Sequence, residues 1–372
     1  MRYLNMPLKD RLLNLNYFYI LVICLLSSVG FTMLYDAGGG HLQPWALPQF
    51  IRFFFGIICM VAIAVTPIRF WLKYAYTLYA LSLALLILVA LFGHIGMGAQ
   101  RWLNLYVIKL QPSELMRISL VLALACYFHR VSLEETRQFT FLIPPLILIL
   151  LPVLLVLKQP DLGTALLLMM IGISMLFAVG VKLRYFIAGC VGFIACIPVA
   201  WHFLLHDYQK RRILTFLNPE NDPLGSGYHI MQSKIALGSG GIFGKGFMKG
   251  TQSHLNFLPE KQTDFIFTMF CEEFGMVGAV GLLLLYAILV ALGLIISLRV
   301  QNKFGRLVSF GVTMTMLTYV FINMAMVMGL VPVVGVPLPM VSYGGTAMIT
   351  LMMGFGLLLN ADLYRDWRLP RY

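Results

Sequence analysis

Long apolar segments, separated by short polar ones, follow one another along almost the whole chain. Each is close to the roughly 20 residues that span a ~30 Å hydrocarbon core as a helix. A membrane barrel would instead show short segments of alternating polarity, and none are visible. The pattern predicts an all-α polytopic membrane protein, one domain over residues 1–372, with ten transmembrane helices at 15–34, 49–67, 73–93, 113–129, 141–157, 163–180, 185–205, 264–298, 307–331 and 340–362.

Two spans have features of their own. The first, 15–34, follows Lys9 and Arg11, is too long for the core of a signal peptide and lacks a small-residue cleavage site. We therefore interpret it as a retained span. The eighth, 264–298, is long enough to be tilted, to project from the bilayer or to contain a break.

Composition supports a membrane protein and excludes other classes. The chain is 60% hydrophobic and 11% charged, whereas a soluble domain has about 25% charged residues. Its net charge of +12 does not indicate nucleic-acid binding, because Lys and Arg are spread over the loops and form no basic stripe with aromatic residues. All six cysteines fall inside apolar spans, so neither disulfides nor a cysteine metal cluster is expected.

The distribution of Lys and Arg predicts the orientation. Most of those in short segments lie on the side that also holds both termini, so the positive-inside rule places both termini in the cytoplasm. A large loop at 206–263, between spans seven and eight, is then external, and the polar clusters of the chain share its side. The cytoplasmic loops contain no P-loop or nucleotide fingerprint, so no ATP-driven reaction is expected.

The large loop is rich in glycine, notably in the runs 238–241 and 244–250. Long loops of this kind are usually functional or disordered. Glycines let backbone N–H groups approach an anion closely, but they also build tight turns. Their density favours a built site, although either interpretation suits any single glycine.

Asp264 stands where this loop enters the eighth span. It is either a residue of the helix start, which the helix dipole favours, or a partly desolvated carboxylate that accepts a proton from a sugar hydroxyl. Glu272 and Glu273 follow about two turns deeper, where a charge normally faces a partner or a wet cavity.

A second group of charges precedes and opens the fourth span. Glu114 and Arg117 are three residues apart and share one helix face, as an ion pair or as the lining of a substrate groove. Arg101, beside Trp102, suits either a bidentate contact to a diphosphate or an anchor at the membrane interface. Asp161 lies in a very short external turn that brings it to the same side.

The tenth span opens with a segment that contains two prolines and two glycines, Pro337 to Thr346. Such residues break helical regularity at membrane depth, and irregular backbone there must be covered by protein or water. The segment is therefore expected to be buried or to line a cavity.

Together these motifs resemble the SEDS family (shape, elongation, division and sporulation), of the RodA type rather than the FtsW type. The resemblance covers the whole chain. The residues 216–220, 225–229 and 244–246 favour the elongation branch. The motifs that carry it are Arg101-Trp102, Gln111-Pro-Ser-Glu114, Gln159-Pro-Asp161-Leu-Gly-Thr164, Leu258-Pro-Glu260, Thr263-Asp264-Phe-Ile-Phe267 and Pro339-Met-Val-Ser342-Tyr-Gly-Gly345.

The resemblance implies a peptidoglycan glycosyltransferase of the cell inner membrane that polymerises lipid II, the undecaprenyl-diphosphate-linked disaccharide peptide. Implied partners are a class B penicillin-binding protein and the elongation complex, and the implied cofactor is a divalent cation, Mg²⁺ or Mn²⁺, for which no ligands can be assigned. Asp264 matches the catalytic carboxylate, an inverting general base. Expected substrate-binding residues are Arg101, Glu114, Arg117, Asp161, Arg212, Lys245 and Ser342.

One position departs from the family. Where the family usually has Lys, this chain has Arg117, which keeps the charge but cannot act as a base. Two other classes of function stay open. A lipid II flippase would need access from both faces and an internal repeat, which is not visible, and a non-catalytic scaffold for the penicillin-binding protein would not explain intramembrane carboxylates.

Overall fold

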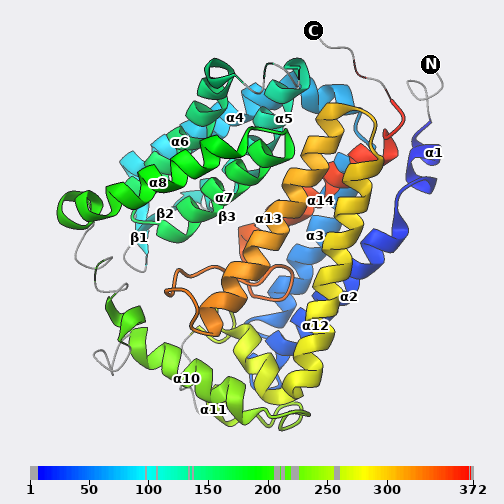
Figure 1. Cartoon of the computed structure of the whole chain (residues 1–372). Helices are drawn as coiled ribbons and strands as arrows, with labels where there is room; N and C mark the ends of the chain where they lie inside the picture. The colour runs from blue at the N-terminus through cyan, green and yellow to red at the C-terminus, as the bar shows by residue number, and fades with distance from the viewer. Residues whose placement is uncertain are drawn as a thin grey trace.

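The computed structural model is a bundle of long helices with a small sheet at its side (Figure 1). A large apolar core extends through the bundle, and polar side chains are buried among it. The structure describes residues 7–96, 99–105, 108–132, 135, 138–204, 210, 214–218, 226–254, 260–367 and 369.

A helix lies at each of the ten predicted spans. Seven of the described helices are long and apolar enough to cross a membrane, and two more, α7 and α8, are shorter and apolar. The chain is thus an all-α multi-pass membrane protein, as predicted, while the count of ten crossings stays a prediction. The helices are α2 (Tyr17–Ala37), α3 (Ala46–Val65), α4 (Ile68–Phe92), α5 (Pro112–Arg130), α6 (Ile143–Lys158, after a 3-10 turn Phe139–Leu142), α7 (Leu162–Ala178), α8 (Leu183–Val199), α12 (Ile266–Arg299), α13 (Lys303–Val327) and α14 (Gly345–Leu363).

The remaining helix of the ten is α5. It is the least apolar of them because it does not face lipid. It packs against α4, α13, α7, α6 and α14, and nearly all of its residues are buried, including Glu114 and Arg117. A helix enclosed by protein on every side can carry charges that a lipid-facing helix cannot. The charged pair Glu114 and Arg117 can therefore lie inside the bundle.

Helix α12 contains the break that its length suggested. Gly275 has φ +63° and ψ −161°, a conformation that only glycine adopts readily. The backbone groups released there bond to the glycine-rich loop: Lys245 N–H donates to the Glu272 carbonyl (3.0 Å), and Met276 N–H donates to the Gly241 carbonyl (3.0 Å). At these positions the glycines of the large loop serve close packing rather than anion binding.

The described part of the large loop includes the helices α10 (Ser226–Ser239) and α11 (Thr251–His254). Helix α10 packs against α12 and α13. The buried hydroxyl of Ser233 shares a hydrogen bond with Thr268 (2.8 Å) and donates to the Val327 carbonyl (2.9 Å). The described part of the loop is therefore an ordered cover on the end of the bundle.

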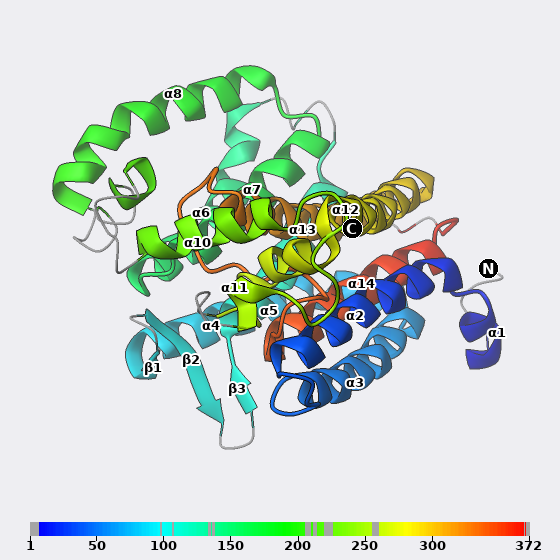
Figure 2. The same ribbon diagram turned by 90° about the horizontal axis from the view of Figure 1, so that it is seen from below.

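Three short strands form an antiparallel sheet that the sequence analysis did not predict: β1 (His94–Gly96), β2 (Ala99–Leu105) and β3 (Ile108–Leu110). Strand β2 contacts α4 and α5, and Figure 2 shows the sheet beyond the end of α4. On another side of the molecule, α8 continues into a π-helical turn, Ala200–Leu204, and is exposed from Ile187 to Pro198, while Tyr185 and Phe186 pack against the core.

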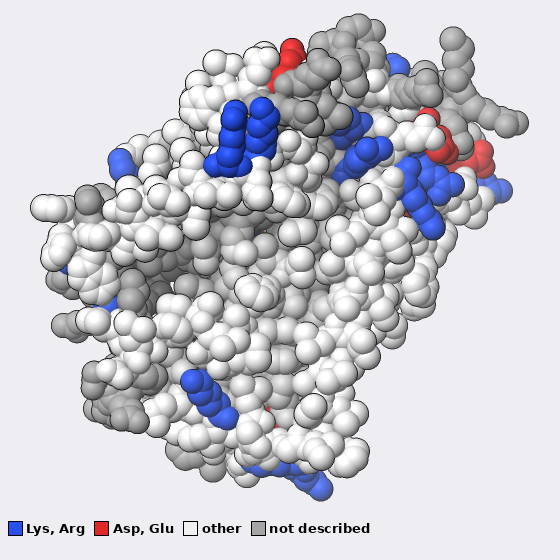
Figure 3. All heavy atoms as spheres, viewed as in Figure 1, with Lys and Arg blue, Asp and Glu red and all other residues white. Residues whose placement is uncertain are grey.

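The described start and end of the chain lie at the same end of the bundle. Helix α1 (Leu8–Leu13) contacts α3, and the Asn16 side chain donates to the Asp362 carboxylate (3.3 Å). Figure 3 shows Lys and Arg gathered toward this end and an uncharged band across the same face. This arrangement agrees with the predicted even number of crossings and with the prediction that both termini lie on the basic side.

Gly275 is expected to be indispensable for stability. A Cβ there would lie 2.3 Å from the Gly244 nitrogen, and the conformation itself costs a larger residue about 1–3 kcal/mol. Gly275→Ala should lower the thermal unfolding temperature of the purified protein in detergent. Gly281→Ala is the matched control, because it lies on the same helix with open space around its Cβ. Equal unfolding temperatures for the two variants would contradict the role of the break.

Candidate active site

A cavity of about 590 Å³ lies at the end of the bundle opposite to the described termini. Its wall is built from the starts of α5, α7 and α14, from α13, and from the two irregular segments 260–264 and 335–344. Four of the predicted site residues line it together: Asp264, Glu114, Arg117 and Asp161. The segment with two prolines and two glycines lines the cavity, as expected.

Asp264 lies in the turn directly before α12. The N-cap of α12 is Phe265, without a side-chain hydrogen bond, so Asp264 is not the capping residue. Its backbone is fixed by Asn323, whose side-chain amide donates to the Asp264 carbonyl (2.9 Å) and to the Val336 carbonyl (2.7 Å). A Cβ on Gly335 would lie 3.3 Å from Asp264 Oδ2, so a larger residue there would press on the carboxylate.

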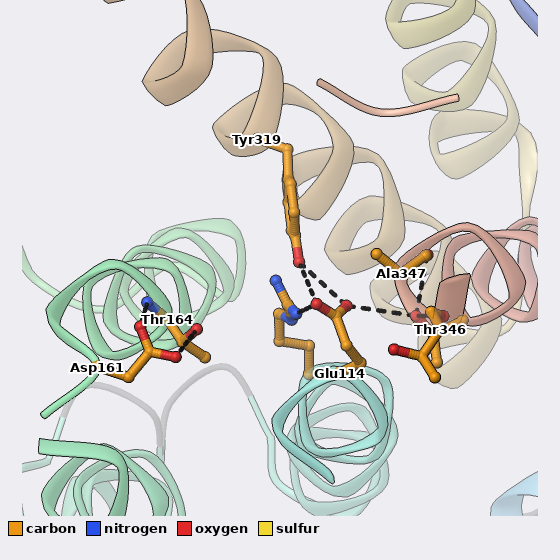
Figure 4. Close-up of polar contacts among 8 residues, drawn as sticks. Glu114, Asp161, Thr164, Tyr319, Thr346 and Ala347 are labelled. Carbon is orange, nitrogen blue, oxygen red and sulfur yellow. Dashed lines mark hydrogen bonds and ion pairs between the residues drawn. The ribbon is translucent and has the colours of Figure 1, made fainter. Parts of the chain in front are cut away.

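Glu114 is the centre of a buried polar network (Figure 4). It forms an ion pair with Arg117 Nη2. It also accepts hydrogen bonds from the Tyr319 hydroxyl (3.2 Å to Oε2) and from Thr350 Oγ1 (3.3 Å). The Arg117 guanidinium lies 4.6 Å from the centre of the Tyr319 ring. The predicted ion pair is therefore present, and it is also part of the cavity wall.

Asp161 both lines the cavity and caps α7. Its Oδ1 accepts from the Thr164 N–H (3.2 Å) and its Oδ2 from the Thr164 hydroxyl (2.8 Å). The very short turn that precedes α7 therefore holds the carboxylate in a fixed direction at the cavity.

The other predicted binding residues have different positions. Arg212 lies outside the described residues, and Arg101 is placed only by its backbone, in β2. Lys245 does not line the cavity: its ammonium bonds to the buried Glu272 (2.8 Å). The Ser342 hydroxyl donates to the Thr263 carbonyl (2.6 Å) and accepts from the Leu338 N–H (2.7 Å), so it joins the two irregular segments.

The sequence analysis missed two residues of α13. Tyr319 and Asn323 are one helical turn apart, and their side chains reach Glu114 and the backbone of Asp264 respectively. The sequence did contain a sign of their role, because polar side chains within an apolar span normally face protein rather than lipid. Through this one face, α13 connects the two carboxylates of the cavity that lie farthest apart in sequence.

The charge of the cavity wall is mainly negative. Among the described lining residues, four carboxylates (Glu114, Asp161, Glu260 and Asp264) face one guanidinium, that of Arg117. No group of three or more His, Cys, Asp or Glu in the described part of the chain is arranged to hold a metal ion by itself. Glu260 is oriented by hydrogen bonds from Gln262 (3.1 Å) and Thr263 (3.1 Å) to its Oε2.

Removal of the Glu114 carboxylate should lower the stability of the protein, because it leaves a buried charge without its partner. Arg117 is 3% exposed, so Glu114→Ala leaves an unpaired cation and should destabilise the protein by about 3–5 kcal/mol. Thermal unfolding in detergent measures this. The double variant Glu114→Ala with Arg117→Leu should recover much of the loss, because it removes both charges. A double variant no more stable than Glu114→Ala would show that the pair is not coupled.

Comparison with known proteins agrees with these features. The family model described as cell cycle protein FtsW/RodA/SpoVE matches residues 10–366. The peptidoglycan glycosyltransferase MrdB of Escherichia coli is 47% identical over 83% of each chain, and a probable peptidoglycan glycosyltransferase FtsW of Geobacter sulfurreducens is 38% identical over 78% of each.

Two solved structures share the fold. One, described as structural coordination of polymerization and crosslinking by a peptidoglycan synthase complex, superposes with a TM-score of 0.82 at 29% identity, over 95% of this chain and 99% of that one. The rod shape determining protein RodA of Thermus thermophilus superposes with a TM-score of 0.71 at 26% identity over the same shares. By its sequence and its fold, the chain belongs to the FtsW/RodA/SpoVE family.

Proposed function

We propose that this chain is a peptidoglycan glycosyltransferase that polymerises lipid II into β-1,4 glycan strands during cell elongation. The observation that carries the proposal is the presence of Asp264 and the Glu114–Arg117 pair in one cavity. The glycosyltransferase names of the curated relatives support it. The elongation branch is supported by the greater identity to the E. coli MrdB protein than to the Geobacter FtsW protein, and by the RodA fold.

In this proposal Asp264 is the general base. Its carboxylate takes the proton of the acceptor's 4-hydroxyl while that oxygen bonds to the anomeric carbon of the donor. The bond from this carbon to the diphosphate breaks, and the diphosphate leaves with the electron pair. Attack from the face opposite to the leaving group turns an α linkage into a β linkage. Because a diphosphate leaves as an anion, one base suffices, and Arg117 acts by its charge.

We also propose that Mg²⁺ or Mn²⁺ takes part. Mg²⁺ is usually held by one or two carboxylates together with substrate phosphates. Glu260, which lines the cavity as a hard oxygen donor, fits such a shared site, while Asp264 keeps the role of base. When bound, the cation would neutralise charge on the leaving diphosphate. The protein's own part is to hold Glu260 and Asp264 through the turn that Ser342 and Asn323 fix.

Localisation and partners complete the proposal. The basic end that holds the described termini supports cytoplasmic termini in the inner membrane, and we propose that the cavity opens on the external side. A class B penicillin-binding protein, with other elongation proteins, is the proposed partner. The fold shared with a complex that coordinates polymerization and crosslinking supports it.

Polymerisation of purified lipid II, with a transpeptidase-inactive partner present, tests the function. Wild type should form glycan chains, and Asp264→Asn should be slower by about 10²–10⁴-fold, the usual share of a general base. Asp366→Asn is the control, since this carboxylate is 48% exposed in its pair with Arg365 and does not line the cavity.

Two outcomes would count against the proposal. Near-wild-type chain formation by folded, partner-bound Asp264→Asn would remove Asp264 as the base. A folded complex of the wild type that makes no chains would favour a transporter or a scaffold instead.

A further inference from the structure

The first turn of α14 faces the cavity with its backbone. Residues 344–347 all line it. The first N–H groups of a helix have no partner within the helix, and the N-cap, Gly344, has no side chain that could accept from them. The positive end of a 19-residue helix is therefore directed at the cavity without a side-chain cap.

An independent feature of this turn is the hydroxyl of Thr346. The residue is 6% exposed and lines the cavity, and its Oγ1 has no hydrogen-bond partner in the described part of the chain. Thr350, one turn further on, differs because its hydroxyl bonds to Glu114 (3.3 Å). Figure 4 shows the Thr346 side chain on the side of α14 that faces Glu114. Buried hydroxyls nearly always have a partner, so this one indicates a group that binds here.

A positive charge stands beside the same turn. The guanidinium of Arg52, from α3, lies 4.8 Å from the centre of the Tyr343 ring. A Cβ on Gly345 would lie 3.6 Å from Arg52 Cζ, an ordinary contact distance, so the guanidinium lies against this turn although Arg52 is not among the cavity-lining residues. Its Nη1 is buried and has no hydrogen-bond partner among the described residues.

We infer that the first turn of α14, with the Thr346 hydroxyl and the Arg52 charge, binds a phosphate of the diphosphate group of the lipid-linked substrate. Helix-start amides, a hydroxyl and a guanidinium are the donors that recognise such an oxyanion. The carboxylates elsewhere in the wall repel any phosphate that no cation bridges to them, which leaves the α14 corner as the favourable place for one phosphate of the group. This inference rests on the proposed function and assigns the diphosphate a place within that cavity.

Binding of prenyl probes to the full-length protein in detergent tests it without catalysis. The probes are farnesyl diphosphate, farnesol and inorganic pyrophosphate, measured by microscale thermophoresis. Thr346→Val, which keeps the shape and loses the hydroxyl, should weaken binding of farnesyl diphosphate about tenfold, as loss of one hydrogen bond to a charged group predicts. Thr346→Ser should bind it as the wild type does, and farnesol binding should be the same in all variants.

Two further variants sharpen the test. Arg52→Met should weaken farnesyl diphosphate in the same direction, whereas farnesol should bind unchanged. Thr313→Val is the matched control, because this buried hydroxyl donates to the Ser309 carbonyl within α13 (2.8 Å) and does not line the cavity. It should leave the affinity for every probe unchanged.

Several outcomes would overturn the inference. Folded Thr346→Val that binds farnesyl diphosphate with wild-type affinity would do so, as would an equal loss in Thr346→Ser or an equal loss of farnesol. Inorganic pyrophosphate that binds as tightly as farnesyl diphosphate would assign the corner to a free anion rather than to a lipid headgroup.

The proposed function and this inference fail separately. If the wild type binds farnesyl diphosphate in the expected way but makes no glycan, the phosphate site stands and the polymerase does not. If the wild type makes glycan but binds farnesyl diphosphate no better than farnesol, the polymerase stands and this site does not.

Discussion

Non-helical backbone inside a membrane bundle is the constraint on which the rest of this structure depends. Each unpaired backbone group at that depth costs several kcal/mol, so irregular segments need partners from neighbouring helices. The segment 331–344 has them: Gln49 of α3, Tyr286 of α12 and Asn323 of α13 each donate to one of its carbonyls, at 3.0, 2.6 and 2.7 Å. Three helices are thereby fixed to the segment that forms one wall of the cavity.

The large loop meets the same constraint at a second place. Its glycine-rich run bonds to the backbone of α12 where Gly275 breaks the helix. Lys245 neutralises the buried Glu272 one turn earlier. Because Asp264 lies between this loop and α12, fixing the loop at the break also fixes the start of the helix. The carboxylate thus owes its position to backbone contacts on both sides of the turn that carries it.

The sequence predicts those features that depend on the solvent, and it fails for those that depend on particular neighbours. Hydropathy located every long helix, because lipid and protein interiors both select apolar residues over a fixed length. The sidedness of Asp264, Glu114 and Asp161 anticipated their common cavity. Lys245 was assigned to substrate, but its ammonium pairs with Glu272. Such pairs form between segments whose contact no local pattern encodes, and the strands of 94–110 escaped prediction for the same reason.

The helices α5, α7 and α14 begin at the cavity, and the residues at their positive ends differ in charge. Asp161 caps α7 with its carboxylate, and Glu114 lies in the first turn of α5. Both charges are favourable to the helix dipole, and both make the wall acidic. Helix α14 begins instead with Gly344 and Gly345 and has no acidic residue in its first turn. In the proposed reaction, the acidic part of the cavity would hold the base that takes a proton from a hydroxyl, and the α14 corner would hold the anion. A donor sugar with a diphosphate leaving group requires this separation, because the two charges of its reaction develop on opposite faces of one carbon.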